Sequence, residues 1–182
     1  MMSRNEALDL VKAHVKNKNL QKHMYATEAV MRGLASRFQE DEETWGLAGL
    51  LHDLDYDQTA SDFSKHGYMT VEILQDKDVP EEILQAIKSH PGHVERESMM
   101  DKALYAADPI TGLIVAAALM HPSKKLKFVN TEFIERRYKE KRFAAGANRE
   151  QIQSCETMGL SLHDFIEMSL RAMQSIDQEL GL

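Results

Sequence analysis

The sequence has few of the features that mark secreted or membrane-spanning proteins. Its 182 residues include one cysteine, Cys155, so no internal disulfide can form. The amino-terminal stretch has neither the apolar core nor the small-residue cleavage site of a signal peptide, and we therefore expect a reducing, cytoplasmic setting. The longest apolar stretch, residues 109–120, is shorter than the ~20 residues that a membrane span needs. This predicts a soluble protein without a membrane partner.

An excess of positive charge is also missing. The chain has 22 Lys and Arg against 29 Asp and Glu, a formal net charge of −7. Because no broad positive field exists to neutralise phosphates, we expect no nucleic-acid partner. The charge is uneven, however, since residues 121–142 hold eight Lys or Arg against three Glu. This basic segment is suited to contact a small anion.

Strand-like alternation, internal repeats and linkers rich in Pro or Ser are scarce. Apolar residues recur mostly at spacings of three and four, and the 4 Pro and 9 Gly fall largely between such segments. The pattern predicts an all-α fold in a single domain, 1–182, with a core at about 18–120 and a C-terminal helical extension at about 121–182. The expected helices are 4–16, 20–39, 42–54, 65–76, 80–90, 99–119, 129–141, 148–158 and 161–180, with N-caps at Asp41, Asp78, Asn148 and Ser161.

One predicted helix ends on an unusual group of polar residues. Residues 45–54, "WGLAGLLHDL", are apolar almost all round, which is typical of a central helix surrounded by others. The end of such a helix lies inside the bundle. Burying His52 and Asp53 there without partners would cost on the order of several kcal/mol. They therefore need hydrogen-bond partners or a cation.

Four further residues could complete a cation site, because His23, His66, His90 and Asp108 lie on or beside apolar helix faces. Taken singly, each has a structural explanation: a hydrogen-bonded core histidine, an exposed first-turn residue, a histidine at a helix C-terminus, or an N-cap before a proline. One shared cation site explains all of them together better than four separate accounts, because histidine is the commonest metal ligand.

This ordered series resembles the HD-domain superfamily of metal-dependent phosphohydrolases, in particular the subgroup with extra histidines that holds two metals. The family has a first His on one helix, a His-Asp pair ending a second and an Asp on a later helix, which map to His23, His52-Asp53 and Asp108. The additional histidines map to His66 and His90, with His93 as an alternative to the latter. Where many relatives read His-Asp-Ile-Gly, this chain continues with Leu54-Asp55.

The resemblance implies an HD-type helical bundle with a buried metal site. Its ligands would be His23, His52, Asp53, His66, His90 and Asp108, and the cofactor would be a divalent transition metal, with two ions of Fe, Mn, Zn, Ni or Co. Asp53 would bridge the ions, and a metal-bound hydroxide would attack phosphorus. The expected substrate is a phosphate ester of a small molecule, a nucleotide or another phosphorylated metabolite.

Several polar residues outside this ligand set are candidates for supporting roles. Asp57 and Asp55 could orient a histidine or the attacking water, although both are equally typical of an exposed turn. Lys124, Lys125 and Arg137 could hold the phosphate of the substrate, or could belong to a solvated loop and helix surface. The pattern specifies no oligomeric state.

Two rival functions are compatible with the same fold. Some HD-fold proteins use a similar site with two irons for oxygen-dependent cleavage, and this ligand set is suited to iron as well. The other rival is a non-catalytic binding or signalling module, which would be expected to have lost some of the ligands. The complete series favours an enzyme.

Overall fold

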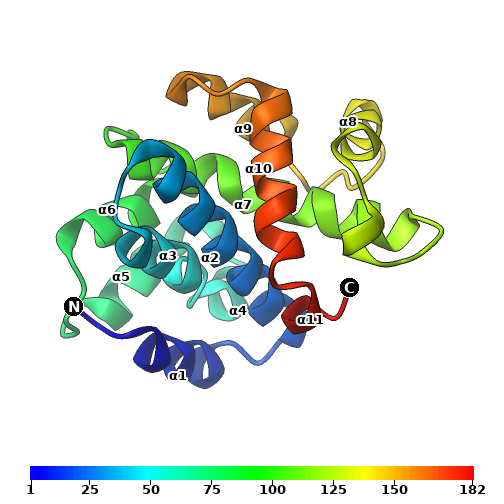
Figure 1. Cartoon of the computed structure of the whole chain (residues 1–182). Coiled ribbons are helices and arrows are strands. Elements are labelled where there is room, and N and C mark those ends of the chain that lie inside the picture. Colours follow the sequence, from blue (N-terminus) through cyan, green and yellow to red (C-terminus); the bar gives the residue numbers. More distant parts are fainter.

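The computed structural model describes all 182 residues and contains helices but no strands, so the all-α prediction is confirmed. Its centre is the pair α2 (Lys18–Phe38) and α3 (Glu42–Leu51), which a short turn joins into a helical hairpin (Figure 1). All residues of α3 from Thr44 to Leu51 are buried. The close packing depends on Gly49, because a Cβ there would lie 2.7 Å from the carbonyl oxygen of Thr27.

The long helix α7 (Met99–Met120) crosses the bundle beside α2 (Figure 1). Pro109 lies inside it without ending it, so Asp108 is an interior helical residue and not the N-cap of a second helix. By length and composition α7 could cross a membrane, and it is the only such helix. However, 56% of its most apolar window is buried within the bundle. That burial is typical of the core helix of a globular protein.

A group of short elements follows α3 and closes one side of the bundle. They are α4 (Tyr56–Thr59), the 3-10 turn η1 (Phe63–Lys65), α5 (Tyr68–Leu74) and α6 (Glu81–Ser89). The second of the short α-helices, α5, packs on α6, and α6 packs on both α3 and α7. Gly67 precedes α5 with φ +81°, and a Cβ there would lie 2.9 Å from the carbonyl oxygen of Ile87. Glycine is therefore required where the chain turns toward α6.

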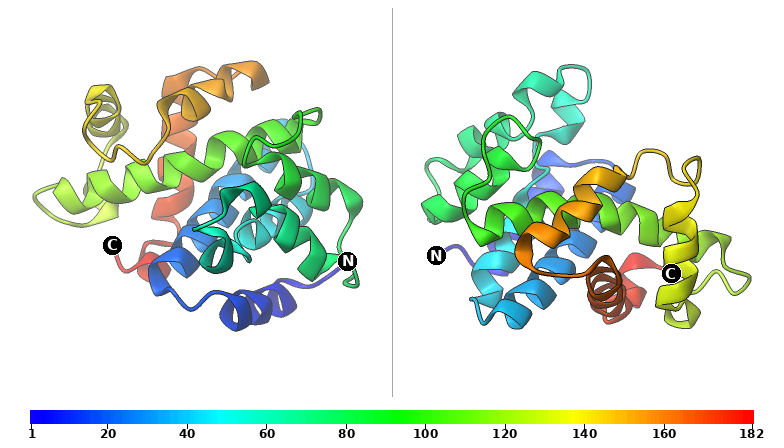
Figure 2. Two further views of the ribbon diagram at one scale, coloured as in Figure 1. Left: turned by 180° about the vertical axis from the view of Figure 1, so that it is seen from behind. Right: turned by 90° about the horizontal axis from the view of Figure 1, so that it is seen from above.

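The remaining elements cover the outside of the central pair. The N-terminal α1 (Arg4–His14) packs on α3, and α10 (Leu162–Gln174) packs across α2 and α7. Between α7 and α10 lie η2 (Leu126–Phe128), α8 (Thr131–Lys139), α9 (Arg149–Gln153) and η3 (Ser154–Met158), and α11 (Asp177–Leu180) ends the fold. Seen from above, α9 crosses over α7 (Figure 2). The buried apolar residues of core and extension form one continuous cluster.

The predicted helices agree with the structure except at four places. The segment 55–64, outside the predicted helices, holds α4 and the start of η1, and the segment 120–128, also outside them, holds η2. The predicted helix 148–158 divides into α9 and η3, and 161–180 divides into α10 and α11. The predicted caps Asp41, Asn148 and Ser161 accept hydrogen bonds from first-turn amides. The predicted cap Asp78 is wrong, because Pro80 occupies that position and the Asp78 carboxylate accepts from the terminal ammonium group instead.

Candidate metal centre

The carboxylate of Asp53 lies at the centre of a ring of histidines. It follows α3 directly, where His52 has left the helix hydrogen-bonding pattern, and both residues are buried. One oxygen, Oδ1, lies 3.4 Å from Nε2 of His52, 3.3 Å from Nε2 of His66 and 3.5 Å from Nε2 of His90. The other oxygen, Oδ2, lies 3.4 Å from Nε2 of His23. A single carboxylate thus faces two groups of ligands from its two oxygens.

On the Oδ2 side, α2 and α7 contribute His23 and Asp108. Nε2 of His23 lies 3.1 Å from Oδ1 of Asp108 and 3.2 Å from Nε2 of His52. On the Oδ1 side, Nε2 of His66 and Nε2 of His90 lie 3.1 Å apart. The donor atoms therefore form two adjacent groups that share Asp53. Two overlapping sets of three have mutual distances within 4.8 Å, namely His23, His52 and Asp108, and His52, Asp53 and His90.

The other ring nitrogen of each histidine is held by a hydrogen-bond acceptor. Nδ1 of His52 donates to the Gly49 carbonyl at 2.8 Å and Nδ1 of His90 to the Ile87 carbonyl at 2.6 Å, because a carbonyl can only accept. Nδ1 of His66 donates to Oδ1 of Asp55 at 2.8 Å. Each of these three rings therefore keeps its proton at Nδ1 and can present an Nε2 lone pair toward Asp53.

The fourth histidine follows the same rule through a hydroxyl group. Nδ1 of His23 lies 2.9 Å from Oγ1 of Thr111. The single proton of that hydroxyl is donated to the Asp108 carbonyl at 2.9 Å, so the hydroxyl oxygen accepts from His23. All four Nε2 atoms can thus serve as ligands at once. Four lone pairs and two carboxylates directed at one another repel unless protons or cations lie between them.

In the absence of metal, the pKa values show that protons take this place. Burial lowers the pKa of His23, but its hydrogen bonds to Asp108 and Asp53 outweigh burial and raise the pKa to about 10. Burial opposes charge on His66 also, yet Asp53 and Asp55 raise its pKa to about 9. His52 has no such compensation, and burial lowers its pKa to about 4. The site therefore favours positive charge at positions that face Asp53.

The two carboxylates stay ionised, although Asp53 is buried and Asp108 is only partly exposed. Burial acts to raise the pKa of Asp53, but the charge of His52 and hydrogen bonds from His23, His66 and His90 lower it well below its usual value. Burial acts to raise the pKa of Asp108 also, but the hydrogen bond and the charge of His23, together with the charge of His52, lower it. Four imidazoles and two carboxylates are ligands that suit Fe, Mn, Zn, Ni or Co. The donor set therefore fits the predicted metal ions.

Of the two aspartates that follow the His-Asp pair, Asp55 supports the cluster. It is fully buried and accepts hydrogen bonds from Nδ1 of His66 at 2.8 Å and from the backbone amides of Gly67 at 2.8 Å and Thr70 at 3.0 Å. Asp57 is exposed and instead accepts from the amide of Lys16 at 2.8 Å. Asp57, predicted as a catalytic residue, is therefore not brought to the cluster, because its carboxylate accepts from the segment that follows α1.

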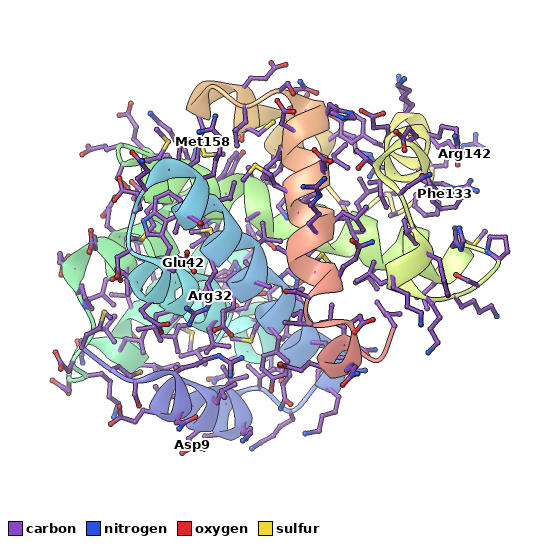
Figure 3. All side chains as sticks on the ribbon, in the orientation of Figure 1. Asp9, Arg32, Glu42, Phe133, Arg142 and Met158 are labelled. Carbon is purple, nitrogen blue, oxygen red and sulfur yellow. The ribbon has the colours of Figure 1, made fainter.

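The three basic residues predicted to bind substrate lie outside the cavity. Twelve helical residues, a rise of about 18 Å, separate Asp108 from the end of α7, and Lys124 and Lys125 lie beyond that end. Arg137 pairs with Glu140 at 3.0 Å on α8. Phe133 on α8 and Arg142, which follows α8, lie at the edge of the molecule (Figure 3). The structure therefore does not bring Lys124, Lys125 or Arg137 to the lining of the cavity.

The cluster opens into a cavity of about 560 Å³. Sequence reasoning missed most of its other lining residues. Tyr56 and Phe63 come from α4 and η1, and Gly146, Asn148 and Gln151 come from the segment around the start of α9. The sequence offered only indirect signals, an aromatic residue after the His-Asp pair and an expected helix cap at Asn148. His93, the alternative to His90, lies outside the cluster and contacts the Phe63 carbonyl at 3.0 Å.

Comparison with known protein families agrees with this geometry. The sequence model of the HD domain matches residues 20–119, more than half of the chain. The chain belongs to the HD domain family. HD domains form a superfamily of metal-dependent hydrolases, most of them phosphohydrolases. The predicted family is confirmed, and the match ends before the segment that carries Asn148 and Gln151. Comparisons with curated proteins and with solved structures found no match.

Proposed function

We infer that this HD-domain protein is a phosphohydrolase that uses two divalent transition-metal ions to hydrolyse a phosphate ester of a small molecule. One observation carries the proposal: all four histidines donate from Nδ1 to separate acceptors, and all four direct Nε2 toward Asp53 or Asp108. A histidine that serves only packing has no need of this arrangement. Four at one point favour a ligand role.

Each part of the cluster has a distinct task in this reaction. Asp53 faces both groups of donors and would be shared between the ions, with His23 and Asp108 on one side, His66 and His90 on the other, and His52 within reach of both groups. The bound ions supply an activated water and neutralise charge on the phosphate. Hydrolysis forms a bond from the water oxygen to phosphorus, breaks the ester P–O bond, and leaves the alcohol with a proton. The cavity of about 560 Å³ is suited to a small substrate.

Elemental analysis and a phosphate-release assay test the proposal together. Wild-type protein should carry about two Fe, Mn, Zn, Ni or Co ions per chain and release phosphate from phenyl phosphate or from members of a panel of phosphorylated metabolites. Asp53→Asn should lose both the metal and the activity, because it removes the shared ligand charge.

A matched control exists four residues along the chain. Asp57→Asn makes the same chemical change at a carboxylate outside the cluster, and the amide oxygen can still accept from Lys16. It should retain metal and activity. Folded wild-type protein that takes up no metal after reconstitution would refute the proposal. Bound iron with oxygen consumption and no phosphate release would show that the di-iron oxygenase is correct instead.

A further inference from the structure

The wall of the cavity contains hydrogen-bonding groups that the fold does not use. Gln151 lines the cavity, and its side-chain amide makes no hydrogen bond within the protein. The side-chain oxygen of Asn148 accepts from the amides of Glu150 and Gln151, which leaves its NH₂ group free. These amides lie on the C-terminal extension, outside the matched residues 20–119. They are available for a ligand in the same cavity as the metal centre.

Exposed aromatic rings line another part of the same cavity. Phe63 is 53% exposed and Tyr56 is 40% exposed, although large aromatic residues are usually covered. Both rings rest against the ring of His66, with centroids 5.0 Å and 5.3 Å away. Their position is therefore held by the metal centre itself. Aromatic faces next to a polar site are suited to stack on a flat ring of a substrate.

The cavity has no positively charged side chain to bind additional phosphate. No Lys or Arg lines it, and the nearby guanidinium of Arg96 covers the ring of Tyr105 at 3.9 Å. Two divalent ions would bring four positive charges against the three carboxylates of Asp53, Asp55 and Asp108. One phosphate monoester carries about −1.5 to −2 near neutral pH and already exceeds that surplus. Each further phosphate would add charge that nothing in the cavity neutralises.

We propose that Gln151 and Asn148 are specificity-determining residues that select a substrate with one phosphate and a flat, uncharged ring whose edge forms hydrogen bonds. Nucleoside monophosphates have this chemistry, and their triphosphates do not fit the charge of the cavity. The phosphate would lie at the metal centre, the ring against Phe63 or Tyr56, and its polar edge at the two amides. This inference rests on the proposed phosphohydrolase function and gives the C-terminal extension a part in it.

Three variants test these contacts without disturbing the metal ligands. Gln151→Leu removes an amide that has no partner in the protein, so the fold should tolerate it. Asn148→Asp keeps an oxygen that can cap α9 and replaces the NH₂ donor with a second oxygen that carries negative charge. Gln178→Leu makes the Gln-to-Leu change at an exposed position beside Lys125 and Lys127, away from the cavity, and serves as the matched control.

The experiment compares phosphate release from the four common nucleoside 5′-monophosphates, their triphosphates and phenyl phosphate. We expect kcat/KM for the best monophosphate to exceed that for its triphosphate at least tenfold. Gln151→Leu should raise KM for that monophosphate on the order of tenfold, the effect of one lost hydrogen bond. Asn148→Asp should raise it at least as much, because it removes a donor and also adds a negative charge. In Gln151→Leu, KM for phenyl phosphate should change less than twofold, because the ring of phenyl phosphate has no hydrogen-bonding edge. Gln178→Leu should change KM for neither the monophosphate nor phenyl phosphate.

Failure of the inference and failure of the function give different results. Two results would overturn the inference while phenyl phosphate is still hydrolysed, so that the function stands. One is an equal kcat/KM for the monophosphate and its triphosphate. The other is an equal rise of KM for the monophosphate and for phenyl phosphate in Gln151→Leu. If no substrate is hydrolysed, the proposed function fails. Calorimetric binding of the monophosphates to wild type and to Gln151→Leu then tests the inference about substrate selection. Equal affinity, or no binding to either protein, overturns the inference, while weaker binding by the variant supports it.

Discussion

The carboxylate of Asp55 holds His66 in place from the side opposite to the metal centre. Its Oδ1 accepts the Nδ1 proton of His66 at 2.8 Å, while its Oδ2 accepts from the amides of Gly67 and Thr70. The two residues are eleven apart in sequence and are both buried. Because a carboxylate partner fixes the tautomer and raises the basicity of a ligand histidine, Asp55 strengthens the Nε2 atom that faces Asp53.

Replacing this carboxylate should weaken metal binding without unfolding the protein. In Asp55→Asn the amide oxygen can still accept from the backbone, but the charge that supports His66 is gone. We expect one ion to bind 10- to 100-fold more weakly, roughly the usual effect of losing such a partner, while the ion held through His23 is largely retained. Metal titration of the variant, with Asp57→Asn as control, measures this. Unchanged affinity for both ions would show that Asp55 serves packing alone.

Metal binding should release protons. The pKa of His23 is raised to about 10 and that of His66 to about 9, so in the metal-free protein both hold a proton at neutral pH. A metal ion must displace these protons, and its apparent affinity should therefore rise with pH until about 9 to 10. Calorimetry at pH 7.5 in buffers with different ionisation enthalpies should show up to two protons released per chain. A binding enthalpy that does not depend on the buffer would contradict this.

The same histidines make the stability of the metal-free protein depend on pH. Their pKa values in the folded protein exceed the value of about 6.5 expected in the unfolded chain. The stability that they contribute is therefore fully present below pH 6.5 and is lost as pH rises through about 9 and 10. The Tm of chelator-treated protein should fall between pH 7 and pH 10. In Asp53→Asn, which removes a partner of both histidines, that fall should be smaller.

Removing the metal should lower Tm at neutral pH. An ion that binds the folded chain and not the unfolded one stabilises it by about 4 kcal/mol when the free metal is 1,000 times the dissociation constant. Thermal unfolding with and without a chelator measures the difference. Asp53→Asn should show no effect of the chelator, and an equal effect in both proteins would mean that the metal acts elsewhere.

The position of the His-Asp pair depends on how closely α3 approaches α2. A Cβ on Gly49 would lie 2.7 Å from the Thr27 carbonyl oxygen and 2.9 Å from Cα of Glu28, both of them backbone atoms that cannot move aside easily. Gly49→Ala should therefore cost about 1–3 kcal/mol in the free energy of unfolding and reduce metal content. Gly112→Ala, also within a helix but with open space around the new Cβ, should be neutral or slightly stabilising in denaturant unfolding.

Much of the fold and of the candidate ligand set could be predicted from the sequence, because the spacing of apolar residues along a helix shows which of its faces is buried. The spacing of apolar residues marks inward faces, and His23, His66 and His90 stand on or next to such faces, which favoured one shared cation site over separate explanations. The apolar stretch before His52 and Asp53 likewise required that the pair be buried. Resemblance to the HD-domain family supplied the order of the ligands.

The tertiary structure alone decided which neighbours surround these ligands. Asp55 and Asp57 are both aspartates that follow the His-Asp pair, and the sequence does not distinguish them. In the structure, the turn into α4 directs Asp55 toward His66 and Asp57 toward Lys16. The basic residues Lys124 and Arg137 are prominent in the sequence but do not line the cavity, whereas the uncharged Gln151 does. Helical periodicity depends on residues three and four apart, but a cavity wall depends on how distant helices pack, and no local pattern encodes that packing.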